Sequence, residues 1–204
     1  MTHPAATPWD ARFATPDYVF GTDPNHWLAA HARLWQAGDH VLCVADGEGR
    51  NSVWLAQQGL RVDAFDVSAV GLEKARKLAA QAQVNVQYTQ ASTDDYDWPV
   101  EQLDGVAAIF VQFADPDMRQ RMFDHMKRAL KPGGVLVLQG YTPEQLAFGT
   151  GGPREVSHLY TPELLQLSFG DMDILAWERY ERGLDEGPGH RGPSSLTGLV
   201  ARRR

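Results

Sequence analysis

Two acids and two glycines follow a short apolar run in the stretch VLCVADGEGRNSVWLA. Gly47 and Gly49 have no Cβ, so the backbone at these positions allows a ligand to lie against it. A helical pattern resumes directly after them, and the N–H groups that begin a helix can receive an anionic group such as a carboxylate. Asp46 and Glu48 add negative charge, which favours a ligand that is also cationic. The loop therefore predicts a binding site for a ligand that carries both charges.

A third acid stands at the end of the next apolar run. Asp66 follows Asp46 by 66 − 46 = 20 residues, an offset at which a carboxylate accepts hydrogen bonds from ribose hydroxyls. Dinucleotide-binding enzymes share this signal, but Ser52 here replaces the third glycine of G-x-G-x-x-G, and the loop acids would repel a pyrophosphate. S-adenosylmethionine, with its sulfonium, α-ammonium and α-carboxylate, fits the loop better. A structural turn without a ligand is the alternative.

An alternation of strand and helix patterns positions these residues. Apolar runs predict strands at 40–45, 60–68, 84–91, 103–113, 135–141, 172–181 and 194–203. Helical spacing predicts helices at 50–59, 71–83, 115–134 and 161–169. This order is typical of a doubly wound α/β sheet, in which ligands bind outside the carboxyl ends of the strands. The polar, glycine-rich stretch 182–193, for which we expect no regular structure, joins the last two strands without a helix, so one strand should run antiparallel.

Composition restricts the possible classes of function. The charge of 19 − 26 = −7 argues against general nucleic-acid binding, and no apolar run reaches transmembrane length. The single cysteine, Cys43, excludes an internal disulfide and is expected to be an inert, buried residue. Without a signal-like start, a cytoplasmic protein is expected. No His, Cys and carboxylate cluster has metal-ligand spacing, so no metal is expected.

Several motifs together resemble the class I methyltransferases that use S-adenosylmethionine, and more narrowly the small bacterial group related to tellurite-resistance and thiopurine methyltransferases. The motifs are WDARF and YVFGTDPN near the start, ADGEGRNSVWLA, FDVSAVGLEKA, ALKPGG and QGYTPEQL. The resemblance covers nearly the whole chain. It implies a Rossmann-like sheet of seven strands, mostly parallel with one antiparallel strand. It also implies one domain over 1–204, with an N-terminal lid and substrate segment (1–35) before a core (36–204).

The resemblance also implies which residues hold the cofactor. Asp46, Gly47, Glu48 and Gly49 would hold its methionine part, with Asn51 beside them. Asp66 would hold the ribose, with Val67 and Ser68 against the adenine. Ala91 and Ser92 would border the adenine edge, and the segment from Val111 to Phe113 would pass beneath the sulfonium.

The chain departs from the pattern of the wider superfamily in two places. Cys43 stands where an acid is usual, and Ala45 stands where glycine is usual. Which acid meets the α-ammonium therefore stays open. Ser92 stands where an aspartate commonly contacts the adenine amino group, so backbone groups or Asp94 could read the adenine instead.

The acceptor is expected to be a small, soft nucleophile. The fourth predicted strand leads into FVQFADP, without the Asn-Pro-Pro-Tyr-like motif that many amine methylators of this class carry there. A thiolate or other chalcogen needs little help from a base, whereas an amine or hydroxyl must lose a proton. An amine, a carboxylate or a protein side chain is the alternative acceptor. A non-catalytic S-adenosylmethionine-binding domain and a nicotinamide-dependent reductase also stay open, as does the choice between monomer and homodimer.

Candidate acceptor residues lie outside the predicted sheet. Trp9, Arg12 and Phe20 are the substrate-binding candidates of the N-terminal segment, and Tyr18 is its catalytic candidate. The alternatives are that the aromatic residues only cover the sheet and that Arg12 pairs with a neighbouring aspartate, Asp10 or Asp17.

Further candidates lie later in the chain. Tyr141 and Gln139, at the end of the fifth strand, could orient the acceptor, and His190 could act as a base. The alternatives are a packed aromatic residue and a solvated histidine. The glycine-dense stretch 148–156 could form a flap or a plain surface loop.

Overall fold

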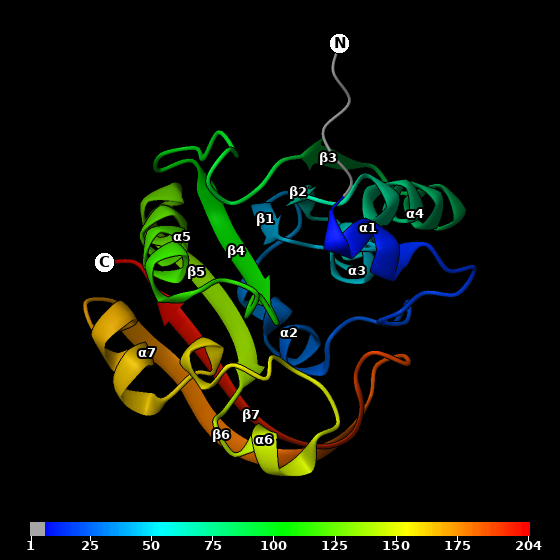
Figure 1. The fold of residues 1–204 in the computed structure, drawn as a ribbon. Coiled ribbons are helices and arrows are strands. Elements are labelled where there is room, and N and C mark those ends of the chain that lie inside the picture. Colours follow the sequence, from blue (N-terminus) through cyan, green and yellow to red (C-terminus); the bar gives the residue numbers. More distant parts are fainter. Residues whose placement is uncertain (1–6) are drawn as a thin grey trace.

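The computed structural model describes residues 7–204, and a sheet with the strand order β3-β2-β1-β4-β5-β7-β6 runs through these residues (Figure 1). The strands are β1 (His40–Val44), β2 (Arg61–Asp66), β3 (Val86–Gln90), β4 (Leu103–Ile109), β5 (Leu130–Tyr141), β6 (Asp173–Asp185) and β7 (Arg191–Arg202). The first five pair in parallel, whereas β7 runs antiparallel to β5 and β6. The predicted doubly wound sheet with one antiparallel strand is confirmed. The first six residues of the predicted lid lie outside the described residues.

Helices cover both faces of the sheet. They are α1 (Pro8–Phe13), α2 (His26–His31), α3 (Arg50–Gln57), α4 (Ala69–Gln81), α5 (Pro116–Ala129), α6 (Gln145–Phe148) and α7 (Pro162–Phe169), with short 3-10 helices η1 (Ala32–Leu34) and η2 (Val156–His158). One apolar core joins α5 and α7 to one face, and a second joins α2, η1 and α3 to the other. None of the helices in residues 7–204 combines the length and the apolar character needed to cross a bilayer.

The strand order fixes where a ligand can bind. β1 lies between β2 and β4, so the chain leaves β1 toward one side of the sheet and later returns on the other side. The loops after β1 and β4 therefore diverge, which opens a crevice at the carboxyl ends of these strands. The loop that begins at Ala45 starts at this point.

Several expected boundaries are wrong. The strand predicted at 103–113 ends at Ile109, and the strand predicted at 135–141 already begins at Leu130. The helix predicted at 115–134 ends at Ala129, because Leu130 already pairs with Leu103 and the residue before Pro132 disfavours helix. The stretch 182–193 is mostly strand, since β6 and β7 stay paired out to Asp185 and Arg191. Ladder hydrogen bonds along the two strands override its polar, glycine-rich composition, and only residues 186–190 form the turn.

Two helices of the N-terminal segment were not predicted. Thr7 accepts a hydrogen bond from the Asp10 N–H and Asp10 accepts one from Thr7, a capping box that starts α1. Asn25 caps α2, whose Trp27 is buried in the core. Residues 14–24, which join these helices, are called the strap below.

Candidate functional site

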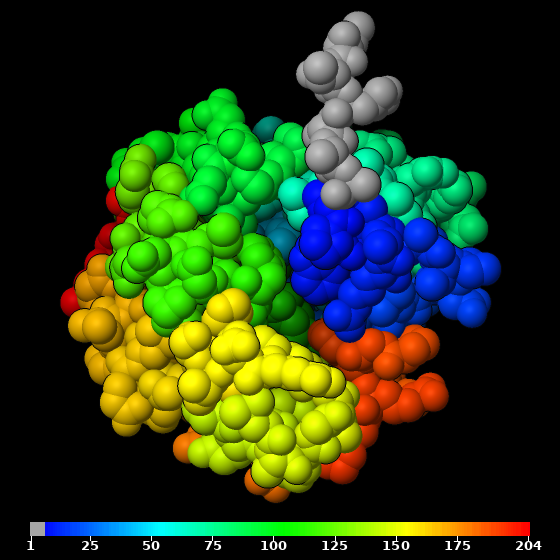
Figure 2. Space-filling model, viewed as in Figure 1, coloured from blue at the N-terminus to red at the C-terminus, as the bar shows by residue number. Residues whose placement is uncertain are grey.

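A cavity of about 590 Å³ opens at the carboxyl ends of β1, β2 and β4. Its walls include the loop after β1, the end of β2, the segment after β3, the segment after β4, the N-terminal segment and the β6–β7 turn. Figure 2 shows the surface hollowed where the blue N-terminal segment faces the green part of the chain. The size suits a small organic ligand, for which pockets of about 300–1,000 Å³ are usual.

The loop after β1 is tightly wound beside this cavity. Ala45, Gly47 and Gly49 all have positive φ, at 48°, 63° and 92°. A Cβ on Gly49 would lie 2.7 Å from the Cβ of Ala75 in α4, and Gly49 is not part of the cavity wall. The missing side chain therefore makes room for a helix, whereas the sequence interpretation had a ligand in that space. Gly47 does line the cavity, as expected.

Asp46 lines the cavity, and its carboxylate bonds to the start of α3. The Ser52 N–H donates to its Oδ1 at 3.3 Å, and the Ser52 hydroxyl donates to its Oδ2. Burial raises the pKa of Asp46 to about 6, and the nearby charge of Asp66 adds to the rise despite the Ser52 hydrogen bonds. A cationic group in the cavity would oppose this shift by favouring the charged carboxylate.

Asp66 lies at the tip of β2 with 6% of its surface exposed. Its Oδ2 accepts the Gly47 N–H at 2.9 Å, and its Oδ1 accepts the Ser68 N–H at 2.8 Å. Burial raises the pKa of Asp66 above its usual range, although these two hydrogen bonds oppose the rise. Each carboxylate oxygen keeps a further lone pair that can accept from a ligand hydroxyl.

An apolar pocket borders the two carboxylates. The cavity wall here includes the predicted residues Val67, Ala91, Ser92 and Phe113, together with Phe65, Thr93 and Met118, which the sequence reasoning missed. Ser92 donates its hydroxyl hydrogen to Asp95 at 2.6 Å. Asp94 is exposed and paired with Arg121, with 2.9 Å between Oδ2 and Nη2.

Two further predicted cofactor residues, besides Gly49, lie outside the cavity wall. Ser68 caps α4 by accepting the Gly71 N–H, and its hydroxyl donates to Asp10. Val111 is buried in the core beneath α5. Neither Ser68 nor Val111 is exposed to the cavity, so the structure does not support their predicted contacts with the cofactor.

Aromatic residues surround a further part of the cavity, called its aromatic end below. Trp9, Phe13, Phe20, Phe110, Tyr141 and His190 line it, with Gly151, Gly152 and Pro153 from the glycine-dense stretch. The Arg12 guanidinium carbon lies 5.3 Å from the Trp9 ring centre and 5.1 Å from that of Phe20, which suits cation–π contact. The structure thus brings together the predicted Trp9, Arg12, Phe20, Tyr141 and His190.

His190 is enclosed by these rings. Its ring centre lies 4.4 Å from that of Phe20 and 4.2 Å from that of Phe110. Burial, together with the charges of Arg50 and Arg12, lowers the pKa of His190 to about 3. The imidazole is therefore neutral near pH 7, and its Nδ1 has no hydrogen-bond partner among the described residues.

Tyr141 presents a second buried polar atom. Its side chain is 1% exposed, and its hydroxyl likewise has no partner among the described residues. Burial raises the pKa of the Tyr141 phenol, so the hydroxyl stays protonated and can donate. Phe110, packed 4.8 Å away, has φ of 56°, a strained value for a bulky residue that often marks a functional site.

Two other predicted residues lie elsewhere. Tyr18 donates to the carbonyl of Lys74 at 3.2 Å, outside the cavity wall. Gln139 is buried in β5, where it accepts from the Asn25 amide at 2.5 Å and donates to the Tyr180 hydroxyl. The structure therefore places neither side chain against the space in which a ligand would react.

Glu48 and Asn51 line the cavity but already have protein partners. Glu48 is 3% exposed, pairs with Lys74 at 2.5 Å and accepts the Val19 N–H at 2.8 Å. Asn51 accepts the Asn25 N–H at 2.9 Å. Both side chains thus bind the N-terminal segment to the loop after β1.

The sequence analysis did not identify two further residues of the cavity wall, Arg50 and Phe110. Arg50 is buried and lines the cavity, and its position as a charged residue between the loop glycines and an apolar helix could have indicated this role. Phe110 follows β4 directly, but only the backbone shows its positive φ. Within residues 7–204, no group of three or more His, Cys, Asp or Glu side chains is arranged to hold a metal ion.

Comparisons with known proteins point to one kind of domain. Residues 41–134 match a family described as "Methyltransferase domain". An uncharacterized methyltransferase of Synechocystis is 30% identical over 132 residues, which are 63% of this chain and 58% of that protein. Uncharacterized proteins of Mycobacterium tuberculosis are 32% identical over 108 residues, and the match spans only 39% of their length.

Solved structures show the same fold at low sequence identity. A structure reported for the conversion of a disulfide bond into a thioacetal group during echinomycin biosynthesis superposes with a TM-score of 0.76 at 18% identity, covering 96% of this chain and 90% of that chain. TehB from Haemophilus influenzae superposes with a TM-score of 0.70 at 16% identity, covering 87% of this chain and 61% of that chain.

Proposed function

We propose that this chain, a class I methyltransferase by its fold and by the family match of residues 41–134, transfers a methyl group from S-adenosylmethionine to a small-molecule nucleophile. The observation that carries the proposal is the pair of carboxylates, Asp46 and Asp66, on one wall of the cavity. Two neighbouring acids suit a ligand with an ammonium group and ribose hydroxyls. They would repel the pyrophosphate of a nicotinamide cofactor.

The residues present fit the cofactor. Asp66 would accept hydrogen bonds from the ribose, and Asp46 would meet the α-ammonium. The apolar wall formed by Val67, Ala91 and Phe113 would enclose the adenine, with Ser92 at its edge. When bound, the cofactor supplies an electrophilic methyl group on its sulfonium.

The aromatic end of the cavity suits the acceptor. The neutral His190 can accept a proton at Nδ1, and the Tyr141 hydroxyl can donate to the acceptor. Arg12 would contact an acceptor that carries negative charge. Trp9 and Phe20 would limit the access of water to the acceptor and so favour a soft nucleophile, and we propose a thiol or other chalcogen.

Three further features belong to this proposal. Residues 1–35 would act as the lid and substrate segment over the core of residues 36–204. The enzyme would work in the cytoplasm, since its one cysteine is buried and unpaired. It would act as a monomer or homodimer.

Transfer of tritium from labelled S-adenosylmethionine tests the proposal. A panel of a small thiol, selenite, tellurite and a primary amine should show labelled product with the thiol or the chalcogen oxyanions. The Asp66→Asn variant is the matched control and should lose most of the transfer. Labelling of the amine alone would show that the acceptor is an amine and not a chalcogen. Tight cofactor binding with no labelled product would show that the chain is a non-catalytic binding domain.

A further inference from the structure

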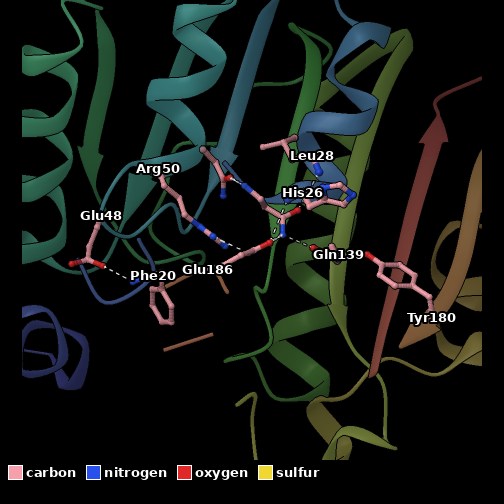
Figure 3. A network of polar contacts seen from close by, with 10 residues as sticks. Phe20, His26, Leu28, Glu48, Arg50, Gln139, Tyr180 and Glu186 are labelled. Atoms are coloured by element: carbon pink, nitrogen blue, oxygen red, sulfur yellow. Dashed lines mark hydrogen bonds and ion pairs between the residues drawn. The ribbon is translucent and has the colours of Figure 1, made fainter. Parts of the chain in front are cut away.

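A buried polar network joins the loop after β1 to the turn between β6 and β7 (Figure 3). Glu186, the first residue of that turn, pairs with Arg50 at 2.7 Å, with side chains only 12% and 6% exposed. The Asn25 amide donates to both Glu186 oxygens, at 3.1 and 3.2 Å, and the His26 N–H donates to one at 3.3 Å. One carboxylate therefore holds Arg50 of α3 together with Asn25 and His26 at the start of α2.

The turn that Glu186 anchors carries His190. The Glu186 N–H donates to the His190 carbonyl at 2.9 Å, which closes the turn. The Gly189 N–H donates to the Val19 carbonyl of the strap at 2.7 Å. A Cβ on Gly187 would lie 2.3 Å from the Gly21 nitrogen, so turn and strap are in close contact.

The loop after β1 holds the strap through a second carboxylate. Glu48 accepts the N–H groups of Val19 and Phe20 at 2.8 and 3.3 Å, and Figure 3 shows its contact with Phe20. The two residues that flank Gly49, Glu48 and Arg50, thus each reach one part of the aromatic end. Glu48 reaches the strap, and Arg50 reaches the turn through Glu186.

We propose that Glu186 is a positioning residue that fixes the turn carrying His190 against the cofactor loop, through its ion pair with Arg50. The inference rests on the proposed function, because it treats the loop as the cofactor site and the turn as the acceptor wall. A cofactor that orders the loop after β1 then also orders the acceptor wall. The expected consequence is that the acceptor binds well only after the cofactor.

The ion pair is suited to this role because both charges are buried. Removing the charge of Glu186 leaves the largely buried Arg50 guanidinium without its carboxylate partner, a costly arrangement that the turn can relieve by opening. Asp185, one residue earlier, offers a matched comparison. Its pair with Arg191, at 3.0 Å, is exposed, with side chains 78% and 68% accessible.

Hydrogen–deuterium exchange tests the role without a known acceptor. In the ligand-free protein, Glu186→Gln should speed exchange about tenfold in peptides covering residues 183–193 and 17–26, whereas Asp185→Asn should leave the strap unchanged. Glu186→Asp, which keeps the charge on a shorter side chain, should give the same direction with a smaller change. Glu186→Asp takes the place of Glu186→Gln in this experiment if Glu186→Gln does not fold. Wild-type exchange rates in both peptides of the Glu186 variants would overturn the proposal.

S-adenosylhomocysteine as the probe tests the coupling. In the wild type it should slow exchange in residues 44–52 and also in 183–193, and in Glu186→Gln the second effect should disappear while the first remains. If S-adenosylhomocysteine does not bind at all, the proposed function fails, while the ligand-free exchange still decides the role of Glu186. With any acceptor that the tritium assay identifies, Glu186→Gln should raise its KM about tenfold with a smaller change in kcat. An unchanged KM would contradict the coupling.

Discussion

The Asp66 carboxylate accepts the backbone N–H of Gly47 at 2.9 Å, so the tip of β2 is joined directly to the loop after β1. This bond holds the loop that carries Asp46 against the tip of β2, where Asp66 lies, and both residues line the cavity. Their charges raise each other's cost of ionisation, which is part of the reason that the pKa of Asp46 is raised. A cationic ligand with hydroxyl groups would relieve that cost.

Replacing Asp66 tests its predicted contact with the ribose. Asp66→Asn keeps the size of the side chain but loses a charged acceptor, so it should weaken binding of S-adenosylhomocysteine by about 1–3 kcal/mol in calorimetry. Asp171→Asn is a control at an exposed acid outside the cavity wall and should bind normally. Unchanged affinity in Asp66→Asn, with an unchanged unfolding midpoint, would remove Asp66 from the cofactor site.

The raised pKa of Asp46 predicts a pH-dependent affinity. An acid whose folded-state pKa is raised from 3.8 to about 6 stabilises the free protein at low pH and loses that contribution as the pH rises through 6. The α-ammonium of the cofactor needs the charged form, so binding should release a proton near pH 5.5.

Calorimetry in buffers with different ionisation enthalpies measures this proton. The affinity should rise between pH 5 and 7 and then level off, and Asp46→Asn should lack the rise. Binding that releases no proton in the wild type would show that another group meets the ammonium.

The lowered pKa of His190 predicts a free energy of unfolding that falls as the pH falls, the opposite of the contribution of Asp46. A histidine whose folded-state pKa falls from 6.5 to about 3 stabilises the fold above pH 6.5 and loses that contribution as the pH falls toward 3. The free energy of unfolding of the wild type should therefore drop by about 1.4 kcal/mol per pH unit below 6, relative to His190→Gln. Urea titrations of both proteins at pH 7, 6 and 5 give the difference. Parallel curves would mean that His190 is accessible to water.

Replacing Gly49 should lower the free energy of unfolding, because an added Cβ would collide with α4. Gly49→Ala meets both the strain of a positive φ, about 1–2 kcal/mol, and the overpacking of Ala75 in α4, about 1–3 kcal/mol. Gly133→Ala is the matched control, because Gly133 has φ of +85° and no atom within 4 Å of the added Cβ. Chemical denaturation should show a larger loss in the free energy of unfolding for Gly49→Ala. Equal losses would mean that α4 moves aside.

Much of the sheet could be predicted because β1, β2, β4 and β5 contain apolar runs and β3 alternates, with helical patterns between most of the parallel strands. Local rules also placed Asp46, Gly47 and Asp66 at the carboxyl ends of β1 and β2, where the structure has them. The capping box of Thr7 and Asp10 was visible in the sequence and would have predicted α1.

The features that could not be predicted depend on contacts between segments that are distant in the sequence. Glu48 points to the strap and Ser68 to Asp10, so the types of these residues did not reveal their partners. The pairing of β6 with β7 out to Asp185 depends on ladder hydrogen bonds rather than on composition. Tyr18 and Gln139 fit an acceptor site by type, and only the packing shows that they bond elsewhere.

A calorimetric titration with S-adenosylhomocysteine, run beside one with NADH, tests whether the cavity holds the methyl donor. One S-adenosylhomocysteine should bind per chain, and NADH should give no binding heat. Binding of NADH with no response to S-adenosylhomocysteine would contradict this proposal.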